Sequence, residues 1–227
     1  MDYGKVTAII LGAGSSSRMN GLNKLMEPLG QHPVIAKSID TLHNSRLISE
    51  IIIVSSKDNV RQLNSMVDDY KWNKVSNIVI GGDRRQDSVW QGLKSFPICD
   101  LVVIHDGARP FIDDNMLASG VIAASKFGAA TAGIPIRDTI KRSDNSGSVT
   151  ATLDRTNLWS VQTPQIFKYD VIMNAHQTVQ FDVTDDAAMI ESIGGTVTIF
   201  EGSIYNLKIT EPKDLLLARA ILQLKSR

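Results

Sequence analysis

The first 136 residues alternate between two kinds of segment, and this alternation restricts the fold more than any other feature of the chain. Short β-rich apolar runs give way to longer stretches in which apolar residues recur at helical spacing. The predicted strands are 6–11, 50–55, 77–80, 101–104 and 130–136, and the predicted helices between them are 34–43, 60–70, 86–96 and 115–127. This order is typical of an α/β fold in which helices cover both faces of a mostly parallel sheet.

Polar loops follow three of the predicted strands. The first strand runs into Gly12 and a loop that reaches Lys24, the third runs into Gly81, and the fourth runs into His105 and Asp106. Ligands of parallel α/β sheets bind beyond the carboxyl ends of the strands. We therefore expect three separate strands to deliver functional groups to one edge of the sheet.

The loop after the first strand has the composition of a phosphate-binding loop. An apolar run, 9–11, leads into Gly12, Gly14 and three serines, and then to the cations Arg18 and Lys24. Backbone amides at such a turn, together with two cations, favour an anionic ligand. An ordinary strand-to-helix turn would explain the glycines, with the two cations as solvated surface residues. That alternative gives no reason for both cations to stand beside the loop.

Two better-known phosphate loops fit this segment poorly. A P-loop requires Gly-Lys followed by Ser or Thr, which occurs nowhere in the chain. A dinucleotide fingerprint requires a third glycine where Ser17 stands and an acid after the second strand, where Ser55 and Ser56 follow instead. The segment therefore indicates a nucleotide site of another type.

Length and charge narrow the class of protein further. The 227 residues contain no linker-like stretch, which favours one large domain. The 24 basic and 24 acidic residues balance, so we expect a small anionic ligand and no nucleic acid. Cys99 is the lone cysteine, no secretory signal is recognisable, and no apolar run reaches the length of a membrane helix. We expect a cytoplasmic protein without a membrane partner.

Residues 137–160 interrupt the alternation. Two β-capable segments, 137–142 and 149–155, flank a cluster of turn formers at 143–148. Two-stranded hairpins are marginally stable alone, so packing against a second subunit is a natural way to stabilise such an arm. We predict a homodimer, with a mobile surface hairpin as the alternative.

Seven motifs, taken in order, resemble the 2-C-methyl-D-erythritol 4-phosphate cytidylyltransferases of the non-mevalonate isoprenoid pathway. They are 11–19 with 23–24, 81–89, 105–110, 135 with 138–141, 158–165, 184–187 and 206–210. The chain departs from the family pattern at three serines, 15–17, and in the short segment between Met19 and Lys24. The resemblance implies one Rossmann-like nucleotidyltransferase domain over 1–227, with 137–160 as a dimerisation arm.

The family's reaction transfers CMP from CTP to 2-C-methyl-D-erythritol 4-phosphate and releases pyrophosphate. The resemblance implies that Arg18 and Lys24 stabilise charge on the triphosphate, and that Arg155 and Lys208 hold the acceptor phosphate. Arg155 lies at the end of the arm, which implies that it reaches the partner's site. A local ion pair with Asp154 or a similar acid is the alternative for Arg155.

Binding roles follow from the same resemblance. It implies CTP contacts from a first group, which is Gly12, Ala13, Gly14, Ser15, Gly81, Gly82, Asp83 and Ser88, and acceptor contacts from a second, which is Asp106, Arg109 and Thr184. Asp83 and Ser88 could instead be helix caps. Mg²⁺ is the expected cofactor, with Asp106 as its tentative ligand, because Mg²⁺ commonly uses one or two carboxylates together with substrate phosphates. The ion could also be held by phosphates and water alone.

Other chemistries have weaker support in the sequence. The histidines lack metal-ligand spacing, and no nucleophile elbow is present. His105 is interpreted as a structural neighbour of Asp106. A ribitol-5-phosphate cytidylyltransferase and a catalytically silent nucleotide-binding regulator remain as alternatives.

Overall fold

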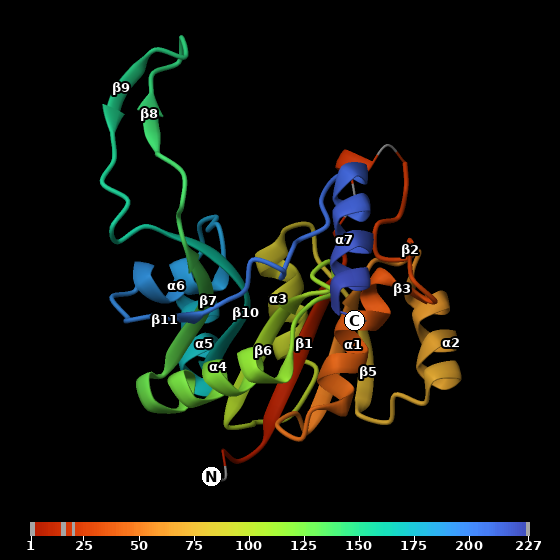
Figure 1. Cartoon of the computed structure of the whole chain (residues 1–227). Helices are drawn as coiled ribbons and strands as arrows, with labels where there is room; N and C mark the ends of the chain where they lie inside the picture. Colours follow the sequence, from red (N-terminus) through yellow and green to blue (C-terminus); the bar gives the residue numbers. More distant parts are fainter. Residues whose placement is uncertain (1–2, 15–16, 20, 226–227) are drawn as a thin grey trace.

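A seven-stranded sheet forms the centre of the protein, with strand order β11-β7-β10-β6-β1-β4-β5 (Figure 1). The computed structural model describes residues 3–14, 17–19 and 21–225. The strands of the sheet are β1 (Val6–Gly12), β4 (Glu50–Ser55), β5 (Val75–Ile80), β6 (Leu101–Asp106), β7 (Ala129–Pro135), β10 (Trp159–Lys168) and β11 (Thr198–Glu201). In this described part, β10 alone runs antiparallel to its neighbours. The mostly parallel sheet is confirmed.

Helices cover both faces of the sheet. They are α1 (Val34–Asn44), α2 (Val60–Tyr70), α3 (Arg85–Leu93), α4 (Asp114–Phe127), α5 (Tyr169–Thr178), α6 (Asp186–Ser192) and α7 (Pro212–Lys225). Ile10 of β1 packs in a core with α1, α2 and α4, whereas its neighbour Ile9 packs in a second core with α3, α5 and α6. Alternate side chains of one strand thus enter two cores, as expected for a strand buried on both faces.

Three short elements of the described chain lie between β1 and α1 in the sequence. They are the 3₁₀-helix η1 (Ser17–Met19) and the two-stranded pair β2 (Pro28–Leu29) and β3 (His32–Pro33). Met19, Leu29 and Val34 form a third apolar cluster with Ile209 and Leu215 of the C-terminal segment. This cluster fixes the loop after β1 against the end of the chain.

The five predicted strands and four predicted helices are all present, with bounds that differ by a few residues. After the arm, the sequence predicts a short β-like run at 206–210 and a helix that starts at 211–212. The helix is present as α7, whereas 206–210 is not a strand. β10 contains four successive polar or proline residues, 162–165, a pattern that does not predict a buried strand. In the structure this stretch is nevertheless buried. The described helices include none long and apolar enough to cross a membrane.

The predicted hairpin arm is present as β8 (Lys141–Ser143) and β9 (Val149–Thr152), paired antiparallel. Asp144 closes its turn, because one carboxylate oxygen accepts hydrogen bonds from the backbone N–H groups of Ser146 and Ser148. The arm projects away from the body, beyond the carboxyl ends of the parallel strands (Figure 1). The last two residues of the predicted arm, 159–160, already belong to β10 in the central sheet.

Candidate active site

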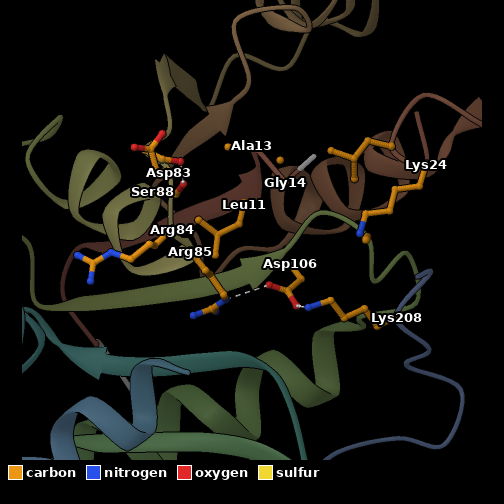
Figure 2. Close-up of a pocket in the computed structure, with 14 residues that line it drawn as sticks. Leu11, Ala13, Gly14, Lys24, Asp83, Arg84, Arg85, Ser88, Asp106 and Lys208 are labelled. Atoms are coloured by element: carbon orange, nitrogen blue, oxygen red, sulfur yellow. Dashed lines mark hydrogen bonds and ion pairs between the residues drawn. The ribbon is translucent and has the colours of Figure 1, made fainter. Parts of the chain in front are cut away.

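The loops after β1, β5 and β6 line a cavity of about 430 Å³ at the carboxyl edge of the sheet (Figure 2). Its wall includes nine residues predicted for the site, namely Gly12, Ala13, Gly14, Lys24, Gly82, Asp83, Ser88, Asp106 and Lys208. Ser15, which was also predicted, lies outside the described residues. We call this space the first cavity.

Close packing explains the two glycines after β5. A Cβ atom on Gly81 would lie 2.4 Å from the Cβ of Ala13 and 2.6 Å from the Ser88 hydroxyl. Gly81 itself lies behind the lining, whereas Gly82 is part of it. Asp83 and Ser88 do not cap α3. The N-cap position is Arg84, and the side chain of Asp87 accepts a hydrogen bond from the backbone N–H of Arg84.

Lys24 lies between two anchored neighbours, Asn23 and Leu25. Its neighbour Leu25 is in the core, and Asn23 donates a hydrogen bond to Asn59 at 2.7 Å. Burial, and then the charge of Lys208, lower the pKa of the Lys24 ammonium. Cations that repel one another in a cavity favour the entry of an anion. Arg18 contributes to the same repulsion, although its side chain is exposed and is not part of the cavity wall.

Asp106 is the centre of a cluster of cations (Figure 2). Lys208 Nζ lies 2.7 Å from one carboxylate oxygen, Arg109 Nε lies 3.9 Å from the same oxygen, and Arg85 Nε lies 3.6 Å from the other. Burial alone would raise the pKa of Asp106, but Arg85, Lys208 and Arg109 outweigh it and hold this pKa well below its usual range. The carboxylate is therefore ionised and binds cations on two sides.

A second cavity, of about 300 Å³, lies on the other side of this cluster. All three predicted acceptor residues, Asp106, Arg109 and Thr184, line it. Arg85, Asp106 and Lys208 line both cavities and so form their common wall. Two adjacent spaces, separated by charged side chains, suit the transfer of a group between two anionic ligands.

Arg155, another predicted site residue, lines neither cavity of its own chain. Its exposed guanidinium donates a hydrogen bond to the Arg137 carbonyl at the base of the arm. Asp154, the alternative partner, accepts hydrogen bonds from the Thr156 backbone and hydroxyl. The local ion pair with Asp154 is therefore not formed.

Several residues of the site were missed by sequence reasoning. Arg85, at the start of α3, was given no role, although it is placed in the common wall. Gln162, Thr163 and Gln165 of β10 line the second cavity with Asp185. The available signal was a run of polar residues around a proline, but only the long-range contacts of β10 reveal where these side chains point.

His105 supports Asp106 from within the core. Its ring lies fully buried between the Thr163 hydroxyl, 3.2 Å away, and the Arg109 carbonyl, 3.1 Å away. Thr163 also accepts a hydrogen bond from the Asp106 backbone N–H. Burial lowers the pKa of His105 to about 4. These contacts fit a structural role better than that of a general base.

The pKa of His105 predicts acid sensitivity. In the unfolded chain His105 binds a proton below about pH 6.5, whereas in the folded protein it does so only below about pH 4. The free energy of unfolding therefore falls as the pH drops through this window. The expected loss is about 3 kcal/mol. Urea unfolding of the wild-type protein and of His105→Gln across the window measures it, because every other titrating group is common to both. Equal pH slopes for the two proteins would contradict the assignment.

Fold and site together define an α/β protein with two adjacent cavities at the carboxyl edge of its sheet, which share a wall of charged side chains. The sequence model of the family described as 2-C-methyl-D-erythritol 4-phosphate cytidylyltransferase matches residues 6–224. The chain belongs to this family.

Individual relatives agree with the family match. A protein of Dehalococcoides mccartyi with the family's name is 42% identical over 219 residues, covering 96% of each chain. One of Clostridium acetobutylicum is 43% identical over 224 residues, covering 96% of this chain and 98% of that protein. The crystal structure of 4-diphosphocytidyl-2C-methyl-D-erythritol synthase from Anaerococcus prevotii superposes with a TM-score of 0.86 at 30% identity, covering 98% of this chain and 100% of that chain.

Proposed function

We propose that this protein transfers CMP from CTP to 2-C-methyl-D-erythritol 4-phosphate, giving 4-diphosphocytidyl-2-C-methyl-D-erythritol and pyrophosphate. Membership of the family supports the reaction. The observation that carries it is the common wall of Arg85, Asp106 and Lys208 between the two cavities. An acceptor in one cavity and a triphosphate in the other would meet at this wall.

The first cavity is the proposed site of CTP. Gly82, Asp83 and Ser88 would contact cytosine and ribose, beside the close packing of Gly81 against Ala13 and Ser88. The amides of 12–14 and the Lys24 ammonium would bind the triphosphate. Arg18 stands near enough to Lys24 to lower the pKa of that lysine, so the triphosphate could recruit its guanidinium.

The second cavity is the proposed site of the acceptor. Arg109 and Thr184 line it, and Asp106 would accept a hydrogen bond from an acceptor hydroxyl. An oxygen of the acceptor phosphate forms a bond to the α-phosphorus of CTP as the bond from that phosphorus to pyrophosphate breaks. No covalent enzyme intermediate is needed, so positioning and charge stabilisation supply the rate. Lys24 and Lys208 both line the first cavity and would contact the reacting anions.

Mg²⁺ is the proposed cofactor. In the described residues no three His, Cys, Asp or Glu side chains gather into a metal site. Mg²⁺ is commonly bound by one carboxylate together with phosphates and water, and Asp106 could supply that carboxylate. One of its two oxygens already forms an ion pair with Lys208. The ion would therefore be held mainly by the triphosphate, with Asp106 as its protein ligand, and would supply neutralising charge.

A homodimer is the proposed assembly, in the cytoplasm. The exposed arm and the position of Arg155 outside both cavities of its own chain support an arm that completes the partner's site. Each active site would then be composite.

The test is a direct assay of pyrophosphate release. Purified protein with Mg²⁺ is offered CTP and either methylerythritol phosphate or ribitol phosphate, and then ATP or GTP in place of CTP. We expect release with CTP and methylerythritol phosphate, and strong preference over purine triphosphates because backbone groups at Gly81 and Gly82 would match the edge of a pyrimidine. Comparable kcat/KM with a purine would contradict the proposal. Preference for ribitol phosphate would show that the protein is a ribitol-5-phosphate cytidylyltransferase. Binding of CTP without turnover of either acceptor would favour a catalytically silent regulator.

A further inference from the structure

Two adjacent arginines connect the start of α3 to the segment that precedes and begins α6. Arg84 forms an ion pair with Asp182 at 2.5 Å, and Arg85 forms one with Asp186 at 2.7 Å. The Asp182 side chain is 78% exposed, whereas that of Asp186 is 1% exposed. Ion pairs in water contribute little, but a buried pair whose partner is removed leaves a costly unpaired charge. The two pairs therefore differ in importance.

Arg85 is held between two carboxylates. Its Nη1 contacts Asp186, and its Nε faces Asp106 at 3.6 Å (Figure 2). The other oxygen of Asp106 faces Lys208 and Arg109. Asp186 thus restrains Arg85, and Arg85 in turn restrains the direction in which Asp106 presents its carboxylate.

Asp186 is itself fixed from the sheet. Gln165 of β10 accepts hydrogen bonds from the backbone N–H groups of Asp186 and Ala187, both at 3.1 Å. The same glutamine donates to Asp185 at 2.7 Å, and Asp185 caps α6. Thr184, in the wall of the second cavity, comes directly before this cap. Gln165 therefore anchors both the segment that carries Thr184 and, through Asp186, the Arg85 side chain that faces Asp106.

We propose that Arg85, held by Asp186, is a positioning residue that keeps Asp106 and the Thr184 segment aligned for the acceptor. This inference rests on the proposed function of the two cavities. Neither side chain needs to touch a reacting atom. Misplacement of reacting groups by about 1 Å can cost on the order of 100-fold in rate, so loss of the pair should reduce acceptor use more than CTP binding.

The test compares two identical substitutions in one segment. Asp186→Asn neutralises the buried partner, and Asp182→Asn neutralises the exposed one as the matched control. Acceptor KM and kcat are measured at saturating CTP, the Kd of CTP by calorimetry without acceptor, and unfolding by heat. For Asp186→Asn we expect acceptor kcat/KM to fall on the order of 10- to 100-fold, with the Kd of CTP within about 3-fold of wild type. Asp182→Asn should leave all values near wild type.

Arg85→Lys provides a second variant if Asp186→Asn folds poorly, because it keeps the charge and loses the planar fork. We expect the same loss of acceptor kcat/KM from Arg85→Lys. The double variant with Asp186→Asn should lose little more than either single variant, because both substitutions remove the same ion pair. Acceptor kcat/KM within about 3-fold of wild type in the folded variants, or equal losses in CTP and acceptor binding, would overturn the inference. Inactivity of the wild-type protein would instead refute the proposed function, and the inference with it.

Discussion

Lys24→Ala is expected to lower kcat by on the order of 10²- to 10³-fold. Lys24 extends into the cavity from a segment anchored by Asn23 and Leu25, so its ammonium is preorganised. Charge on the phosphorus oxygens increases in the transition state, and a fixed cation stabilises that state more than it stabilises bound CTP.

Single-turnover kinetics with CTP and methylerythritol phosphate measure this loss, and calorimetry measures CTP binding separately. Lys57→Ala, which removes an exposed lysine outside both cavities, is the matched control. Arg18→Ala should act in the same direction if the triphosphate recruits this exposed guanidinium. Wild-type turnover by Lys24→Ala, with CTP binding intact, would show that the lysine has another role.

Arg155→Ala and Lys208→Ala are each expected to abolish most use of the acceptor while sparing CTP binding, yet their mixture should regain activity. In a composite site, Lys208 comes from one subunit and Arg155 from the other. A heterodimer of the two variants then has one site with both defects and one with neither. Up to about half of the heterodimer sites should work if the sites act independently.

The mixture is assayed after subunit exchange, with heterodimers verified by native mass spectrometry. Each variant incubated alone under the same conditions gives the background. If verified heterodimers remain inactive, Arg155 acts in the site of its own subunit, and the arm has no catalytic part. If no dimers form at all, the arm is a mobile hairpin.

Local pattern was sufficient to predict the first half of the fold. The sheet strands β1, β4, β5, β6 and β7 are rich in apolar residues, and the helices between them have regular spacing. The turn at Asp144 follows from its own short-range hydrogen bonds. The three loops at the carboxyl edge could be predicted for the same reason, since parallel strands end together.

Long-range polar contacts could not be predicted in this way. Gln165 is buried because its amide meets Asp185 and the backbone of α6, and Thr163 is buried because it meets His105. The residues next to Thr163 and Gln165 in the sequence do not indicate these distant partners, so the sequence pattern does not predict β10 as a buried strand. Arg85 escaped recognition for the same reason: its role depends on Asp186, which lies far along the chain.

The antiparallel strand β10 has a consequence for how such proteins diversify. The residues that line the first cavity alone come from 11–25, 82–88 and 108, whereas those that line the second alone come mostly from 161–165 and 184–185, together with Arg109. Under the proposed assignment of the cavities, mutations that reshape β10 and the start of α6 would change the choice of acceptor and leave the lining of the donor cavity as it is.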